Sequence, residues 1–110
     1  MTTPSLTYIQ ELADGDASFE QQLLAVIQKE FPIERGIYFK LLEEKKHTEL
    51  TQLVHKIKHK FTILGLEEET KLASNFEMDI KTQNFDLQKE FETVLDTISD
   101  FLLKHNPQEL

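Results

Sequence analysis

Hydrophobic residues recur at intervals of three and four along almost the whole chain, which is the spacing of one face of an α-helix. No stretch alternates apolar and polar residues as a half-buried strand would, and only three glycines and three prolines interrupt the pattern. The sequence therefore predicts an all-α protein. We expect helices at about 5–13, 17–31, 32–46, 48–65, 67–80 and 86–102.

Turn-forming and helix-breaking residues mark where one predicted helix ends and the next begins. Residues 14–16, Asp-Gly-Asp, form a turn, and Asp16 can cap the helix that follows. Pro32 is expected to end the second helix and to begin a third, because its ring cannot continue the backbone hydrogen bonding. Thr48 is a candidate N-cap, and Gly65 a candidate C-terminal residue, of the fourth helix. The short connections predict an up-and-down four-helix bundle with one or two additional short helices at the N-terminus.

The same spacing predicts which side chains form the core. In the second and third helices the candidate core residues are Phe19, Leu23, Val26, Ile27, Phe31, Ile33, Ile37, Tyr38 and Leu41. In the fifth and last helices they are Leu72, Phe76, Ile80, Leu87, Phe91, Val94, Leu95, Ile98, Phe101 and Leu102. The stripe of the last helix is the most regular in the chain.

Length and composition narrow the class of protein further. The chain has 110 residues, of which 39% are hydrophobic and 29% charged, so we expect one globular domain spanning 1–110. No apolar run approaches the roughly 20 residues that span a bilayer, and the first residues lack the features of a signal peptide. The chain has no cysteine, which excludes disulfides and thiolate chemistry. We therefore expect a cytoplasmic protein.

The charge is unevenly distributed along the chain. The net charge of −8 argues against nucleic acid as a partner, since phosphate backbones are bound chiefly by lysine and arginine. Residues 48–64, however, hold three lysines against one acid, a net charge of +2, whereas the rest of the chain carries −10. The sequence thus places one positive segment in an acidic protein.

This positive segment coincides with the fourth predicted helix, in which His55 lies opposite the apolar side. With an advance of roughly 100° per residue, the apolar residues fall within an arc of roughly 100° facing away from His55. They are Leu50, Leu53, Val54, Ile57, Phe61 and Leu64. His55 is therefore predicted to face solvent. The residues expected beside it on the exposed face are Thr51, Gln52, Lys58, His59 and Thr62.

An exposed imidazole with a cation one helical turn away suits a carrier of phosphoryl groups. Neutral imidazole is a nucleophile near pH 7, and its N-phosphoryl product is activated enough to pass the group onward. Lys58 can place its ammonium group beside the phosphoryl oxygens. We expect Lys56 and Lys60 to be solvated charges, with the stem of Lys60 along the edge of the core.

Residues 55–66, His-Lys-Ile-Lys-His-Lys-Phe-Thr-Ile-Leu-Gly-Leu, resemble the signature of histidine-containing phosphotransfer (HPt) domains. In that signature an apolar residue, a lysine and a glycine follow the phosphoacceptor histidine by two, three and ten positions. The similarity covers most of the chain and includes the Asp-Gly-Asp turn at 14–16, Phe31-Pro32 and Phe76-Glu77. The chain departs from the family at His59 and Phe61, where glycine and a small residue are common.

The resemblance implies a role for each matching residue. His55 becomes the phosphoacceptor, Lys58 the cation that stabilises the phosphoryl group, and Gly65 the small residue near the end of the active-site helix. A docking partner would contact Gly65 together with Thr51, Gln52, His59 and Thr62. His59 would either crowd this partner or help to recognise it, whereas we interpret Phe61 as a packing residue.

The resemblance also implies a function and a set of partners. A response-regulator receiver domain, phosphorylated on aspartate and supplying its own Mg²⁺, would give its phosphoryl group to His55, and a second receiver would accept it. A hybrid sensor histidine kinase would act upstream. We expect no cofactor of its own, no membrane contact and a monomer. Because the sequence lacks a Gly-rich phosphate loop, we expect no autonomous kinase activity.

Two alternatives remain open on the sequence. His55 and His59 have the i, i+4 spacing of metal ligands, but Lys56 stands where a zinc protease has glutamate, and the nearby lysines would repel a cation. The other alternative is a non-catalytic helical adaptor in which His55 has no chemical role. An adaptor would tolerate replacement of His55, whereas a phosphocarrier would not.

Overall fold

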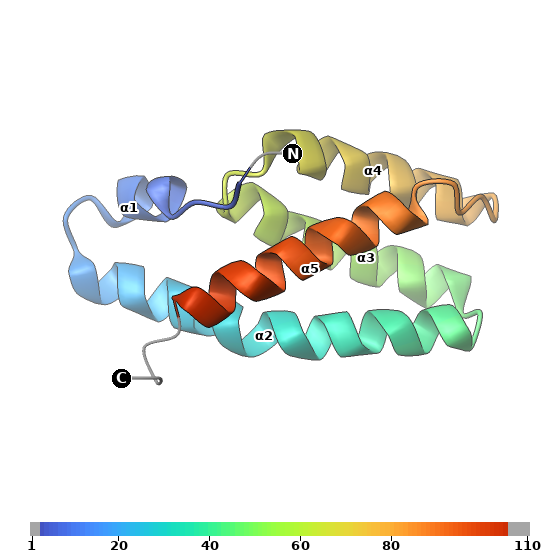
Figure 1. Ribbon diagram of the computed structural model, residues 1–110, viewed down its shortest axis with the longest axis horizontal. Coiled ribbons are helices and arrows are strands. Elements are labelled where there is room, and N and C mark those ends of the chain that lie inside the picture. Colours follow the sequence, from blue (N-terminus) through green and yellow to red (C-terminus); the bar gives the residue numbers. More distant parts are fainter. Residues whose placement is uncertain (1–2, 106–110) are drawn as a thin grey trace.

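The computed structural model describes residues 3–105 and shows an all-helical bundle, with no strand in that range. Its helices are α1 (Thr7–Ala13), α2 (Ala17–Glu43), α3 (His47–Ile63), α4 (Glu67–Lys81) and α5 (Gln88–Lys104). Figure 1 shows α2 and α4 running in one direction along the long axis while α3 and α5 return. Each of these four helices packs on the next, and α5 also packs on α2. The predicted all-α bundle is thereby confirmed, and α1 packs on α2 as a short addition at the N-terminus.

α2 is one uninterrupted helix of 27 residues that passes through Pro32. The prediction that Pro32 separates two helices is therefore wrong. Phe31 and Tyr38 are fully buried and Glu34 is nearly so, which holds the helix against the bundle on both sides of the proline. This tertiary burial outweighs the backbone hydrogen bond that the proline removes.

Pro32→Ala is expected to raise the free energy of unfolding by about 2 kcal/mol, because alanine restores the missing hydrogen bond of a helix interior. Pro32 is exposed, so the change removes no buried contact. Urea denaturation of the two proteins measures the difference. Lys29→Ala, at another exposed position of α2, serves as the control and should stay within about 0.5 kcal/mol of wild type. Loss of stability in Pro32→Ala would show that the proline itself is favoured in α2.

The continuity of α2 also decides which of its side chains reach the core. Its buried residues are Ile27, Phe31, Glu34, Tyr38 and Leu41, at spacings of three and four. A single helix with this buried face turns several of its other apolar residues outward, while Leu23, Leu24 and Leu42 are partly buried against the core. Phe19, Val26, Ile33 and Ile37, predicted as core residues, are therefore exposed, by 43%, 47%, 57% and 41%.

Aromatic rings from four helices meet at the centre of the bundle. Phe91 of α5 lies 5.1 Å from Phe76 of α4, 5.5 Å from Phe61 of α3 and 5.3 Å from Tyr38 of α2, measured between ring centroids. All four side chains are fully buried. The predicted core positions Phe76 and Phe91 and the packing role of Phe61 are confirmed, whereas Phe101 is only partly buried.

The ends of the helices agree in part with the prediction. Asp16 caps α2, since its Oδ1 accepts a hydrogen bond from the Phe19 amide at 3.0 Å. Gly65 follows α3 with φ of 75°, a conformation that glycine adopts without strain, and a Cβ at this position would lie 3.1 Å from Ser5 Oγ. Thr48 is not an N-cap, because α3 already begins at His47.

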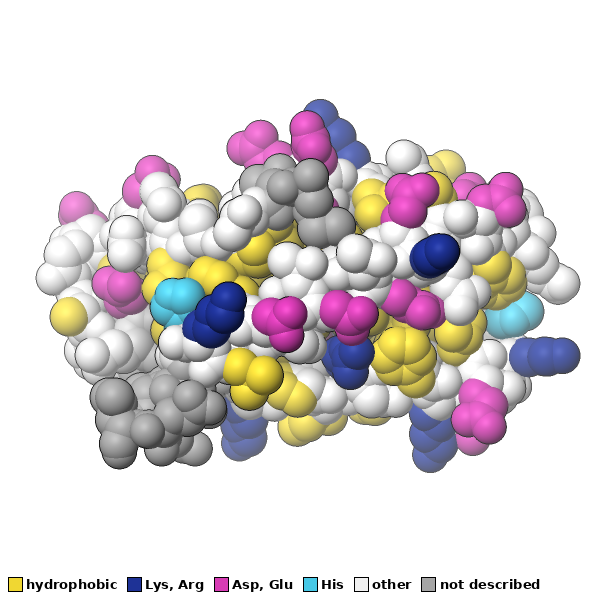
Figure 2. All heavy atoms as spheres, viewed as in Figure 1, with side chains coloured by type: hydrophobic (Ala, Val, Ile, Leu, Met, Phe, Trp, Pro, Cys, Tyr) yellow, Lys and Arg dark blue, Asp and Glu magenta, His cyan; other side chains and the backbone are white. Residues whose placement is uncertain are grey.

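The surface of the bundle is acidic over α5. Figure 2 shows a row of acidic side chains along this helix, whose exposed acids are Glu90, Asp96 and Asp100.

No helix within residues 3–105 combines the length and the apolar character that crossing a membrane requires.

Candidate functional site

His55 lies near the middle of α3, and its side chain is 52% exposed. Val54 and Ile57, on the opposite side of the same helix, are fully buried against the core. The predicted orientation of His55 is confirmed. Because α3 is anchored by its apolar face, it presents the imidazole on a rigid support rather than on a loop.

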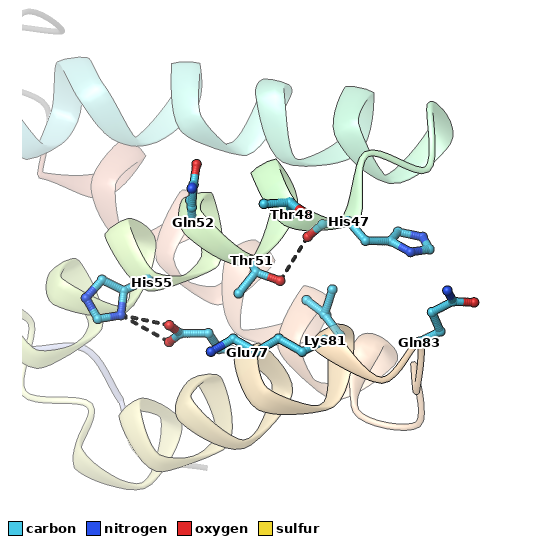
Figure 3. A pocket seen from close by; sticks show the side chains of 9 residues that line it. His47, Thr48, Thr51, Gln52, His55, Glu77, Lys81 and Gln83 are labelled. Carbon is cyan, nitrogen blue, oxygen red and sulfur yellow. Dashed lines mark hydrogen bonds and ion pairs between the residues drawn. The ribbon is translucent and has the colours of Figure 1, made fainter.

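A carboxylate from α4 holds one nitrogen of this imidazole. His55 Nδ1 lies 2.9 Å from Oε1 and 3.2 Å from Oε2 of Glu77, as the dashed lines in Figure 3 mark. An ionised carboxylate only accepts hydrogen bonds, so Nδ1 must be the nitrogen that carries the proton. In neutral His55 the lone pair is therefore on Nε2, which is the nitrogen left to act as a nucleophile.

Lys58 binds the same carboxylate as His55. Its Nζ donates a hydrogen bond to Glu77 Oε2 at 3.1 Å, and the side chains of Lys58 and Glu77 are only 17% and 16% exposed. Burial raises the pKa of Glu77, but the hydrogen bonds from Lys58 and His55 outweigh burial and leave the pKa below its ordinary value. The carboxylate is therefore ionised at neutral pH. Its contribution to stability is present above the ordinary pKa of glutamate and is lost as the pH falls through the lowered value.

The lysine two positions beyond Lys58 has a different environment from the one expected. Lys60 is buried and its Nζ donates to Glu30 Oε1 at 3.0 Å and to Glu34 Oε2 at 3.1 Å, so the prediction of a solvated charge is wrong. A hydrogen bond from Lys60 and its charge lower the pKa of Glu30. Lys56 Nζ also lies 3.6 Å from Glu34 Oε2. Together with Lys58, all three lysines of the positive segment thus face carboxylates of neighbouring helices, and the segment is not an uncompensated positive surface.

The structure brings most of the predicted partner-facing residues to the surface around His55. Gln52, His59 and Thr62 are exposed, and the His59 ring lies 5.0 Å from the His55 ring in an edge-to-face arrangement. Gly65 is half-buried at the end of α3. Thr51 differs from the prediction, because it is only 8% exposed and its hydroxyl donates to the His47 carbonyl within the helix.

A groove of about 700 Å³ runs between α3 and α4 with His55 at one end. Figure 3 shows the side chains along it. Its lining residues are His47, Thr48, Thr51, Gln52, His55, Glu77, Ile80, Lys81 and Gln83. Sequence reasoning assigned no site role to Glu77, Lys81 or His47. Glu77 and Lys81 could have been noticed from their spacing of four residues, because side chains at that spacing meet on one face of a helix.

The described residues offer no evident metal centre. Within 3–105 no group of three or more histidine, aspartate or glutamate side chains is arranged to hold a metal ion. His55 and His59 therefore lack a third side-chain ligand of these types, and His55 Nδ1 is directed to Glu77 instead.

Comparison with known proteins found nothing similar to this chain at a significant level: no protein-family model, no curated protein and no solved structure matched.

Proposed function

We propose that this protein is a phosphocarrier of the histidine-containing phosphotransfer type, with His55 as the phosphoacceptor. One observation carries the proposal: an exposed imidazole on a rigid helix, with its Nδ1 held by Glu77 and the cation of Lys58 on the same carboxylate. The helical bundle and the motif at 55–66 agree with this assignment.

The chemistry follows from the arrangement of these atoms. The lone pair of His55 Nε2 attacks the phosphorus of an aspartyl phosphate on a receiver domain, forming the N–P bond as the P–O bond to the aspartate breaks. The aspartate leaves as a carboxylate, and the Mg²⁺ required belongs to the receiver. The proton stays on Nδ1, where Glu77 stabilises the positive charge that develops on the ring. Transfer to a second receiver is the reverse of this step.

The shape of the surface also fits transfer between proteins. A receiver holds its aspartate in a pocket, so the acceptor must protrude far enough to enter that pocket. His55 fulfils this condition because half of its side chain is exposed on the outer face of α3. The protein is acidic overall, so its net charge would not attract acidic partners. Contacts around His55 would therefore determine partner choice. A hybrid sensor kinase would supply the phosphoryl group upstream.

Phosphoryl transfer from purified receivers tests the proposal. The protein is mixed with Mg²⁺ and each phosphorylated receiver domain of the same genome, and the label on the protein is followed with time. We expect label that is lost in acid and retained in alkali, as for phosphohistidine, and that maps to the peptide containing His55. Absence of label from every receiver would instead support the non-catalytic adaptor, in which the exposed face of α3 serves only for binding.

A further inference from the structure

In the free protein Lys58 is bound to Glu77, which competes with the phosphoryl group that Lys58 is proposed to bind. Its ammonium group is already bound to Glu77 at 3.1 Å, and both side chains are largely shielded from solvent. His55 Nδ1 and Lys58 Nζ both bind Oε2 of Glu77, so Lys58 is held on the Nδ1 side of the imidazole. We infer that its ammonium group moves away from this carboxylate when it binds a phosphoryl group on Nε2. Glu77 would then keep the hydrogen bond from His55 but lose the ammonium group of Lys58, which is costly for a carboxylate that water reaches poorly.

A second cation lies within the same groove. Lys81 follows Glu77 by four residues on α4, the order of acid and base in which an i, i+4 pair is favourable. Figure 3 shows the side chain of Lys81 extending back along α4 toward Glu77. Among residues 3–105 Lys81 has no ion pair, whereas each of the three lysines of α3 has at least one.

We propose that Lys81 is a positioning residue that takes the place of Lys58 at Glu77 when His55 is phosphorylated. This inference rests on the proposed function. In the free protein, Lys58 neutralises Glu77 and Lys81 remains in the groove. In the phosphorylated protein, Lys58 binds the phosphoryl oxygens, Lys81 binds Glu77, and Glu77 continues to accept the hydrogen bond from His55 Nδ1.

The balance of charge favours this exchange. Phosphorylation brings a second anionic group close to Glu77, and two neighbouring anions repel each other unless each has its own cation. Lys56 and Lys60 are held by Glu34 on the side of α3 that faces α2, away from Glu77. Lys81 lines the groove and is paired with no carboxylate of the described part of the chain. Its movement to Glu77 needs only rotation of an exposed side chain.

Phosphorylation by phosphoramidate tests the exchange without any partner protein. The rate of phosphoryl incorporation at His55 is measured for wild type, Lys81→Met, Lys81→Arg, Lys58→Met and the double variant Lys58→Met/Lys81→Met, with the label on His55→Gln subtracted. We expect Lys81→Met to slow incorporation about tenfold, the effect of one charge-assisted hydrogen bond. Lys81→Arg keeps the charge and should stay within about twofold of wild type.

The double variant separates exchange from a general effect of charge. If Lys81 acts by releasing Lys58, its removal has less than about a twofold effect once Lys58 is absent. An equal loss in both backgrounds would show that Lys81 acts by its charge alone and would overturn the exchange, as would no loss in either background. Thermal melting of each variant confirms that the comparison is made between folded proteins.

A spectroscopic measurement checks the same step at Glu77. The side-chain carboxyl resonance of Glu77 is titrated by ¹³C NMR in the phosphorylated protein. In wild type the pKa of Glu77 should stay below its ordinary value, because Lys81 has replaced Lys58, whereas in Lys81→Met it should rise. An unchanged pKa in Lys81→Met contradicts the exchange while leaving the carrier function intact. Failure of wild type to take up phosphoryl at His55 from either phosphoramidate or a receiver would overturn the carrier function as well.

Discussion

Replacement of His55 by glutamine is expected to reduce phosphoryl transfer to the background level while leaving the fold unchanged. Glutamine has no nucleophilic nitrogen, so the N–P bond cannot form. The side chain of His55 is 52% exposed and contributes little to the core, and the glutamine amide can still donate a hydrogen bond to Glu77. The initial rate of label transfer from a phosphorylated receiver measures the first effect, and the thermal melting temperature measures the second.

His59→Gln is the matched control, since His59 is an exposed histidine one turn away on the same helix. It should keep the site of labelling at His55. Any change in its transfer rate should differ between receivers, because His59 lies on the surface that a partner covers. Transfer that persists in His55→Gln but disappears in His59→Gln would show that His59, and not His55, is the phosphoacceptor.

Lys60→Met is expected to lower the free energy of unfolding by about 3 kcal/mol. The residue lies on the same helix as His55, but the expected effect is on stability. The change leaves Glu34, which is 4% exposed, without the cation that binds it at 3.1 Å. Lys56 remains 3.6 Å from Glu34 and limits the loss. Urea denaturation measures the effect, with the slope of the transition checked for constancy.

A second variant tests whether the loss arises from the unpaired carboxylate. Glu34→Leu combined with Lys60→Met removes both charges and should recover most of the stability, because a buried ion pair is often replaced by apolar residues without net cost. A cost below about 0.5 kcal/mol for Lys60→Met alone would mean that the network acts like an exposed ion pair. Both variants should retain phosphoryl transfer, since neither touches His55, Glu77 or Lys58.

The paired lysines change the expected basis of partner recognition. The sequence places three lysines on the helix of His55, and an uncompensated positive helix would attract an acidic partner over a distance. In the structure, Glu34 and Glu77 lie beside the lysines of α3 and compensate much of their charge. Long-range steering by α3 is therefore weak, and recognition depends on contacts made at short range around His55.

Features that depend on local periodicity could be predicted from the sequence. The all-α fold and the range of α4 follow from apolar spacing and helix-end residues. The exposure of His55 follows from its place opposite the apolar stripe of a single helix. Asp16 and Gly65 could be assigned as helix ends because caps and left-handed turns involve only near neighbours in the chain.

Other features required the tertiary structure because they depend on competition between distant parts of the chain. By its local preference Pro32 would end a helix. It lies inside α2 because Phe31 and Tyr38 are buried against other helices. Once α2 is continuous, its outward face carries apolar residues that the local pattern had placed in the core.

The candidate site depends partly on the spacing within one helix and partly on the packing between helices. The sequence identified His55 and Lys58, which are one turn apart on one helix. It could not pair them with Glu77, which is 22 residues from His55 along the chain and reaches it only because α3 and α4 pack side by side. Local spacing determines which side chains are exposed on a helix, but the packing of helices determines which charges meet, and that packing decided the partners of His55, Lys58 and Lys60.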